Sequence, residues 1–361
     1  MLNTKIIQAL EQNLSCNLAR LKCLSLLISA VLRHRTVNLA VLATTNDGKS
    51  TSNESRYRRF QDFFLKFSLC LPSISKFVLS RVPKPSRGFV LAMDRTNWQF
   101  GCKDINFLVI SIIVGKVSIP LVWNVLPAKT KRGNSNTSQR ISLTKKLLSA
   151  LPAKDIYVLT LDREFIGKQW LDWLNDQGVG YIVRIRKNTK VGDSKALDLA
   201  TQRGRKRQKR QLIFGLELFF ASKRVTRNAR SSHLIIVSNR FEGKEALALY
   251  RLRWGIERLF VHLKKKGFDL EATHITDPAK LEKLFGILTL AFLFSFAWGA
   301  HLRATKQKDS AAAKRKSLFR LGLESIINLT EASPQSPQNR RKLREFLHWL
   351  NSDTFGSIFL V

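Results

Sequence analysis

Three short, strongly apolar segments follow one another directly after a stretch at 82–88 that contains two prolines and a glycine. The segments 88–94, 105–115 and 116–126 are rich in Val, Ile and Leu and are separated by turn residues. They are therefore predicted to form an antiparallel meander. This pattern constrains the fold more than any other feature, because such strands need a sheet whose faces the rest of the chain must cover.

Helices and strands then alternate along the chain. The sequence predicts a helix over 141–151, a strand over 156–162, a helix over 166–178 and a fifth strand over 181–187. Strand–helix–strand steps require parallel neighbours joined by right-handed crossovers. The predicted fold class is therefore α/β, with a mixed five-stranded sheet flanked by helices.

The segment 188–237 interrupts this alternation. From Lys187 to Arg230 the chain has 13 Lys and Arg residues against three Asp and Glu residues, with a strand-like stretch between two basic runs. We interpret it as a basic, β-rich insertion that is not part of the core. A long helix over 243–268 and an apolar helix over 281–303 are predicted to follow.

The N-terminal residues carry apolar side chains at the three- and four-residue spacings of helices. A polar break at 44–55 separates one helical run from a second, Arg-rich one at 56–67. Two interpretations stay open here: a small DNA-binding unit, or a helical pair with a solvated basic face. The predicted domains are a helical N-terminal region, which is the candidate DNA-binding unit, an α/β domain in two parts around the insertion, and a basic helical tail, at 1–83, 84–187, 188–237, 238–305 and 306–361.

The chain carries 62 Lys and Arg residues against 26 Asp and Glu residues, a formal net charge of +36. Such an excess opposes compaction by self-repulsion, so a polyanion is the expected partner. Nucleic acid is the first candidate and an anionic membrane surface the second. The most apolar run, 284–298, is short for a membrane span and is predicted to be a buried helix, and no membrane partner is expected.

Four scattered cysteines without metal-ligand spacing indicate free thiols in a reducing cytoplasm, and the first residues lack the features of a signal peptide.

Two aspartates stand at corresponding places in the predicted sheet. Asp94 ends the first strand and Asp162 ends the fourth, and an arginine follows each of them. If these strands are neighbours, the two carboxylates lie side by side beyond the strand ends, where α/β sheets gather functional groups. Paired carboxylates next to bound phosphate suit a divalent cation such as Mg²⁺. The alternative is that each Asp is an ordinary turn residue.

The long predicted helix supplies a third carboxylate. At 100° per residue, Tyr250, Arg253, Glu257 and Lys264 fall within an arc of roughly 60°, beside an apolar face. The side chain of Glu257 can therefore point into a site while the apolar face of its helix stays packed against the core. Spacing alone also allows an ordinary surface pair between Arg253 and Glu257.

These four residues match the pattern Y-x2-R-x3-E-x6-K. The pattern resembles the signature of one branch of the bacterial DDE insertion-sequence transposases, insertion-sequence family four. The segments LAMDRTNW (91–98) and LTLDREFIG (159–167) look like the first and second aspartate motifs of that family. The resemblance covers roughly 85–305 and implies a ribonuclease-H-like catalytic domain.

The resemblance also implies a mechanism. Asp94, Asp162 and Glu257 would be the catalytic and metal-binding triad for two Mg²⁺ ions, with Mn²⁺ as a substitute. Tyr250, Arg253 and Lys264 would hold DNA phosphates near the scissile bond. The reaction would be cleavage at insertion-sequence ends followed by strand transfer into target DNA.

The implied partners are double-stranded DNA, as terminal inverted repeats and target, and a second copy in a synaptic homodimer. The implied location is the nucleoid of the bacterial cytoplasm.

One departure from the family concerns tryptophan. Relatives that pass through a hairpin intermediate stack a flipped base on a Trp of the insertion, and here 188–237 contains none. Phe219 or Phe220 could take that place, because base stacking accepts any aromatic ring. For Trp254, beside Arg253, core packing and DNA stacking both stay open.

Two other functions also agree with the sequence. A catalytically inactive relative would only occupy element ends, and a hydrolytic nuclease would use the same site without strand transfer.

Overall fold

The computed structural model describes residues 2–11, 13–14, 16–45, 51–127, 134–201, 210–227, 230–305, 316–331 and 337–350. The chain forms two compact units. The sheet unit comprises Lys84–Asn97 and Asn106–Arg258. The helical unit comprises Met1–Pro83, Trp98–Ile105 and Leu259–Val361.

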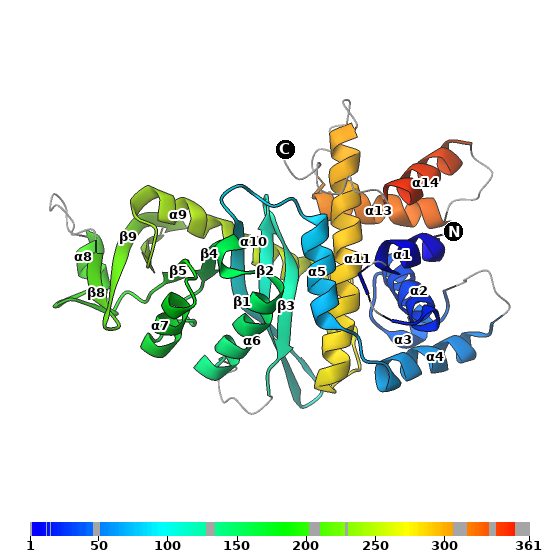
Figure 1. The fold of residues 1–361 in the computed structure, drawn as a ribbon, viewed down its shortest axis with the longest axis horizontal. Helices are drawn as coiled ribbons and strands as arrows, with labels where there is room; N and C mark the ends of the chain where they lie inside the picture. The colour runs from blue at the N-terminus through cyan, green and yellow to red at the C-terminus, as the bar shows by residue number, and fades with distance from the viewer. Residues whose placement is uncertain are drawn as a thin grey trace. The chain divides into compact units, whose positions relative to one another are not determined.

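The main sheet has eight strands in the order β3-β2-β1-β4-β5-β10-β9-β8 (Figure 1). Its strands are β1 (Phe89–Phe100), β2 (Lys103–Val114), β3 (Val117–Val125), β4 (Ile156–Leu161), β5 (Tyr181–Arg184), β8 (Arg210–Ile213), β9 (Leu216–Arg227) and β10 (Arg230–Ser238). β1, β4 and β5 are parallel, whereas β2 and β3 are antiparallel. The five strands that the sequence predicts are thus confirmed, in the order that a ribonuclease-H-like fold requires.

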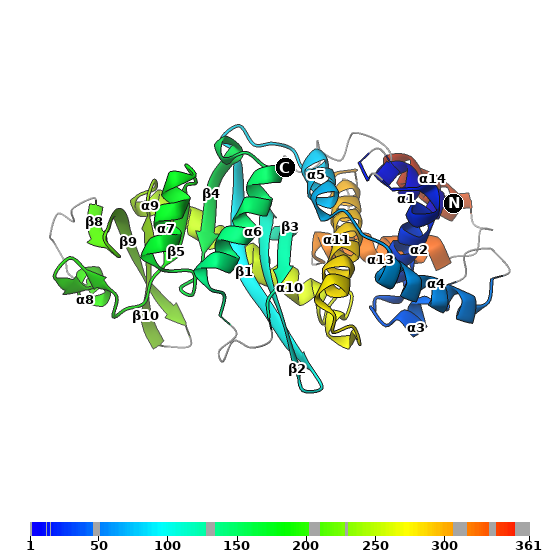
Figure 2. The same ribbon diagram turned by 60° about the horizontal axis from the view of Figure 1, so that its bottom comes forward.

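Two helices provide the crossovers to β4 and β5: α6 (Thr137–Ala150), followed by the single turn η1 (Ala153–Asp155), and α7 (Lys168–Asp176). Both cover one face of the sheet in Figures 1 and 2. A capping box between Asn136 and Gln139 starts α6, so its first free N–H groups are bonded. Beyond α7 the chain turns at Gly178, whose φ of +68° favours glycine.

The insertion differs from the prediction, because its strands continue the main sheet. β10 pairs antiparallel with β5, and β9 and β8 extend the sheet beyond it. Ala221 and Ile236 are buried in a cluster with Val158 and Ile182 of the central strands. The interpretation that the insertion stands apart from the core is therefore wrong. The physical reason is that β5 would otherwise end the sheet with unpaired backbone groups.

Smaller elements connect β5 to β8. A two-stranded hairpin pairs β6 (Lys190–Val191) with β7 (Ser194–Lys195), and α8 (Ala196–Thr201) follows. Most of the basic run at 204–211 lies outside the described residues.

The helix predicted over 243–268 is two helices. α9 (Gly243–Leu252) and α10 (Trp254–Leu263) meet at Arg253, which belongs to neither, and the short η2 (Leu270–Ala272) follows. Tyr250 is the third residue from the end of α9, and Glu257 lies in the first turn of α10. The break therefore falls at Arg253, one of the four residues of the pattern, and separates Tyr250 on α9 from Glu257 on α10.

The helical unit is built around α11 (Pro278–Thr305), which packs against α2 (Leu18–His34), α5 (Leu71–Arg81) and α13 (Leu318–Glu331). Figure 2 shows α5 and α13 beside it. The other helices of this unit are α1 (Leu2–Glu11), α3 (Leu39–Leu42), α4 (Asn53–Lys66) and α14 (Pro337–Trp349). Gly299 and Gly322 permit backbone contact between α11 and α13, because a Cβ at either would lie 1.8 Å from a carbonyl oxygen.

Among the described helices α11 alone is long and apolar enough to cross a membrane, and 94% of its most apolar 18-residue window is buried in the structure. The bent pair of α4 and α5 would pass the same test only as one broken span. The predicted buried helix is thus found.

The Arg-rich run at 56–67 forms most of α4. Arg56, near its start, is buried and donates hydrogen bonds to the carbonyls of Ala43 and Thr51. Arg58, by contrast, is exposed and lies 3.8 Å from Glu54. One arginine of this run is therefore structural, and DNA binding by the region stays a prediction.

Candidate functional site

Asp94 and Asp162 lie at matching positions on neighbouring parallel strands. Met93 of β1 pairs with Leu161, the last residue of β4, and each aspartate directly follows one of these two residues. Asp162 thus comes just after its strand, as predicted, whereas β1 continues to Phe100, so the prediction that Asp94 ends its strand is wrong. Adjacent strands are about 4.8 Å apart, so the two carboxylates are neighbours at one edge of the sheet. The side-by-side placement that the sequence predicts is confirmed.

Arg253 joins two of the three predicted carboxylates. Its Nη1 donates to Asp94 Oδ2 at 2.9 Å and its Nη2 donates to Glu257 Oε1 at 2.5 Å. The Arg253 residue is only 8% exposed. The hydroxyl of Tyr250 donates to Asp162 Oδ1 at 3.5 Å, and the Tyr250 ring lies 5.9 Å from the Arg253 guanidinium. Five of the six predicted site residues thus form one network.

Lys264, the sixth, belongs to the helical unit. There its Nζ lies 2.9 Å from Glu271 Oε1 and 5.6 Å from the centre of the Trp98 ring. The phosphate contact assigned to Lys264 by resemblance stays a prediction.

Sequence reasoning missed Arg184. It is the last residue of β5, and its Nη1 lies 3.9 Å from Asp162 Oδ1. The signal was present, because in the sequence Arg184 follows an apolar run, as Asp94 and Asp162 do. The parallel pairing of β4 with β5 brings this end to the same edge of the sheet.

A second network, also missed, holds the loop that follows Asp162. Arg95 binds Glu164 through two hydrogen bonds of 2.7 Å. The buried Arg140 of α6 donates to the carbonyls of Glu164 and Ile166 at 2.9 and 3.2 Å. Such planar, bidentate arginine contacts fix geometry well. The loop that carries Asp162 is therefore tied to β1 and to α6.

Burial governs the protonation of these groups. It raises the pKa of Asp94 to about 6, although Arg253 and the Arg95 N–H oppose the shift, while Asp162 and Glu164 add to it. Burial likewise raises the pKa of Glu257 against the influence of Arg253. For Arg253, burial would lower the pKa, but Tyr250 and the surrounding carboxylates outweigh it and raise the pKa. Arg253 therefore stays charged.

A cleft of about 740 Å³ opens beside this network. Asp162, Tyr250, Arg253 and Glu257 line it, and the other charged lining residues are all basic: Lys116, Arg184, Arg251 and Arg258. A cationic cleft around a few carboxylates suits a phosphodiester that must be both bound and attacked.

Aromatic side chains near the cleft settle one open alternative. Trp254 lines the cleft and is 52% exposed, so the core-packing interpretation of this residue is wrong. Of the two phenylalanines considered for base stacking, Phe220 is buried, whereas Phe219 is half-buried under the guanidinium of Arg210 at 4.6 Å.

The carboxylate oxygens at this site are chemically suited to bind a divalent cation. Carboxylate oxygens are the ligands that Mg²⁺ prefers, and here Asp94 Oδ2 and Glu257 Oε1 already converge on one cationic group, the Arg253 guanidinium. In the described part of the chain, no three His, Cys, Asp or Glu side chains are grouped so as to hold a metal as they stand.

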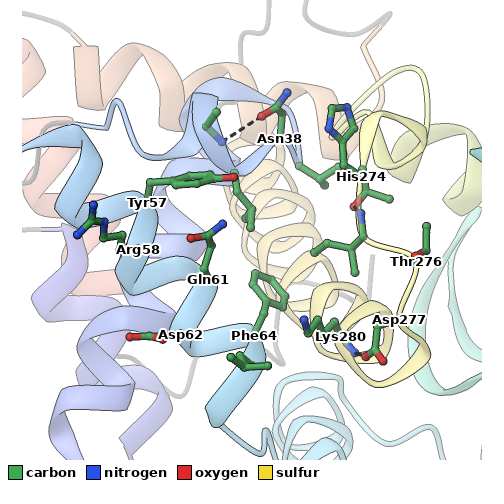
Figure 3. A pocket seen from close by; sticks show the side chains of 16 residues that line it. Asn38, Tyr57, Arg58, Gln61, Asp62, Phe64, His274, Thr276, Asp277 and Lys280 are labelled. Atoms are coloured by element: carbon green, nitrogen blue, oxygen red, sulfur yellow. Dashed lines mark hydrogen bonds between the residues drawn. The ribbon is translucent and has the colours of Figure 1, made fainter.

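A second cleft, of about 680 Å³, lies in the helical unit between α4 and the segment 273–280 (Figure 3). Its charged lining residues are balanced, with Arg58 and Lys280 against Asp62 and Asp277. This cleft therefore lacks the excess of positive charge that a polyanion requires.

Comparison with known proteins identifies a family. The sequence model of the family described as "Transposase DDE domain" matches residues 80–294, more than half of the chain. A solved structure, the piggyBac transposase synaptic complex with hairpin DNA, superposes with a TM-score of 0.44 at 11% identity, covering 97% of this chain and 83% of that one. No curated protein matches. On the family match, the chain belongs to the transposase DDE domain family.

Proposed function

We propose that this protein is a DDE transposase of the insertion-sequence type that resembles family four, cleaving DNA at element ends and joining it to target DNA. One observation supports the proposal beyond the family match: carboxylates from the end of β4 and from α10 line one basic cleft, and Arg253 joins a third carboxylate, from β1, to the one on α10. Asp94, Asp162 and Glu257 supply them, and Arg253 contacts two of the three.

The proposed cofactor is a pair of Mg²⁺ ions, with Mn²⁺ as a substitute. When bound, divalent ions activate the attacking oxygen and stabilise the leaving oxygen of an in-line phosphoryl transfer. Asp94, Asp162 and Glu257 would hold them.

The basic residues of the cleft would position the DNA. An arginine presents a planar fork that matches two phosphate oxygens, so Arg253 and Arg184 suit the backbone next to the scissile bond. Tyr250 donates toward Asp162 and so orients that carboxylate. The exposed Trp254 offers a surface on which a base can stack.

The proposed partners are double-stranded DNA, as terminal inverted repeats and target, and a second copy of the chain in the synaptic complex. The proposed location is the nucleoid of a bacterial cytoplasm. An inactive end-binding relative and a nuclease without strand transfer are the competing functions.

The decisive experiment compares wild type with Asp162→Asn on DNA that carries the element's own ends, in Mg²⁺. Wild type should cleave the ends and join them to a second DNA, and the variant should lose both reactions while binding the ends with unchanged affinity. Asp176→Asn, at an exposed position of α7, is the matched control and should remain active. Cleavage without joining would identify a nuclease, and binding without either reaction would identify an inactive relative.

A further inference from the structure

We propose that Arg253 is an internal counter-cation that occupies the carboxylates in the DNA-free protein and leaves them when a DNA phosphate binds. Metal binding and DNA binding at this site would then be coupled, each strengthening the other. This inference rests on the proposed function, because it concerns how that same site is loaded.

The first step of the argument is geometric. One guanidinium uses Nη1 for Asp94, 159 positions earlier in the chain, and Nη2 for Glu257, four positions later. It therefore engages one oxygen of each of the two carboxylates at the same time. A divalent ion held by Asp94 and Glu257 would use these same oxygens, so the ion and the guanidinium compete for one place.

The second step concerns where the arginine can go. Arg253 lies at the junction of α9 and α10 and is part of neither helix. Its side chain is buried among the carboxylates, yet it also lines the open cleft together with Arg184, Arg251 and Arg258. A DNA phosphate in that cleft offers Arg253 the same bidentate, anionic partner that the two carboxylates now provide.

The third step is energetic. A ligand shifts an equilibrium only by its different affinity for the two states. Phosphate favours the state with Arg253 turned into the cleft, and the metal favours the state with Asp94 and Glu257 released. Both ligands therefore favour the same state, and linkage requires that each raise the affinity of the other by the same factor. Without DNA, the site would stay closed to metal.

The test measures Mn²⁺ binding by electron paramagnetic resonance, with and without a short DNA duplex of arbitrary sequence. For wild type we expect the duplex to raise the Mn²⁺ affinity by about tenfold or more, a coupling of ordinary size. For Arg253→Ala we expect tight Mn²⁺ binding without DNA and little further gain with it. The duplex measured without protein gives the Mn²⁺ held by the DNA itself, which is subtracted.

Matched variants separate this role from general electrostatics and from folding. Arg251→Ala removes one positive charge from the same cleft but touches no carboxylate in the described contacts, so it should keep the coupling of wild type. Arg253→Lys keeps the charge but cannot bridge both carboxylates, so it should bind Mn²⁺ without DNA more tightly than wild type does. Thermal unfolding checks that each variant is folded. If Arg253→Ala does not fold, the test relies on Arg253→Lys.

Two failures are distinguishable. Equal Mn²⁺ affinity of wild type with and without DNA, with no gain in the Arg253 variants, would overturn the counter-cation role while leaving the metal site intact. If neither wild type nor any variant binds Mn²⁺ beyond the level of the duplex alone, the metal site itself is absent and the proposed function fails with it.

Discussion

At the scale of single residues, Asp94 lowers the stability of the fold but is suited to the proposed metal chemistry. Its side chain is only 19% exposed, and burial raises the pKa to about 6 even though Arg253 binds it. The ionised carboxylate that metal chemistry needs is thus less stable in the folded protein than in the unfolded chain. Such strain at a functional site is a known cost of activity, and removing it commonly stabilises a protein.

Asp94→Asn should therefore stabilise the protein near neutral pH while abolishing cleavage. A carboxyl whose folded pKa lies above its unfolded value of 3.8 contributes stability below about pH 4 and loses that contribution as the pH rises through 6. The difference from wild type should reach about 2–3 kcal/mol at pH 7.5 and vanish near pH 4. Thermal unfolding midpoints across this pH range measure it.

Asp176→Asn, at an exposed site, is the control for that series and should show no such pH dependence. A variant at Asp94 that is less stable than wild type at pH 7.5 would show that the bond to Arg253 outweighs the cost of burial.

Asp94 and Asp162 could be predicted because each of them directly follows an apolar run that is visible in the sequence. Arg140 could not be selected in the same way, since nothing local distinguishes it among 62 Lys and Arg residues. The contact of Arg253 with Asp94 spans 159 positions and joins the junction of α9 and α10 to β1. The spacing of residues along the helix predicted only the local pair of Arg253 with Glu257. The structure contains this pair and also the contact of Arg253 with Asp94.

At the scale of elements, Gly255 makes a close contact between the start of α10 and β3. A Cβ at Gly255 would lie 2.9 Å from Ser118 Oγ and 3.2 Å from the Val117 carbonyl carbon of β3. Glycine thus lets the first turn of α10 approach β3 closely. Glu257 lies two residues later in the same turn, so its position depends on this contact.

Gly255→Ala should therefore shift α10 away from β3, lower stability by about 1–3 kcal/mol and reduce DNA cleavage. Ser118→Ala should by itself be nearly neutral, because the Ser118 Oγ is buried and has no hydrogen-bond partner. The double variant should recover part of the loss, since the nearest clashing atom is gone. Unfolding and cleavage rates of all four proteins form a double-mutant cycle, and purely additive effects would contradict this packing argument.

The elements themselves were largely predictable, because hydrophobic period and turn residues are local signals. The five central strands and both crossover helices agree with the sequence. The membership of β8, β9 and β10 in the main sheet was not predictable, because it depends on pairing between β10 and the edge of β5, over 50 residues apart in the chain. The break at Arg253 was also missed, since the apolar pattern continues through it.

At the scale of the whole molecule, the net charge of +36 is the property that sequence reveals most directly. It indicates a polyanionic partner but not where that partner binds. In the structure, basic residues line the cleft that contains Asp162 and Glu257, whereas the charged residues that line the cleft of the helical unit are balanced. Charge near the carboxylates, rather than total charge, should therefore decide how DNA binds to the site.

Salt dependence tests this distinction. Binding of end DNA should weaken steeply with salt, and the slope of log affinity against log salt should be about −4 or steeper, because each contacted phosphate contributes about −0.9. Lys116→Ala and Arg258→Ala, both in the cleft, should each make the slope less steep by about 1. Lys145→Ala, exposed on α6, removes the same charge outside the cleft and should leave the slope unchanged. Equal effects of all three variants would mean that DNA responds only to the total charge, and a flat dependence would rule out phosphate binding by the cleft.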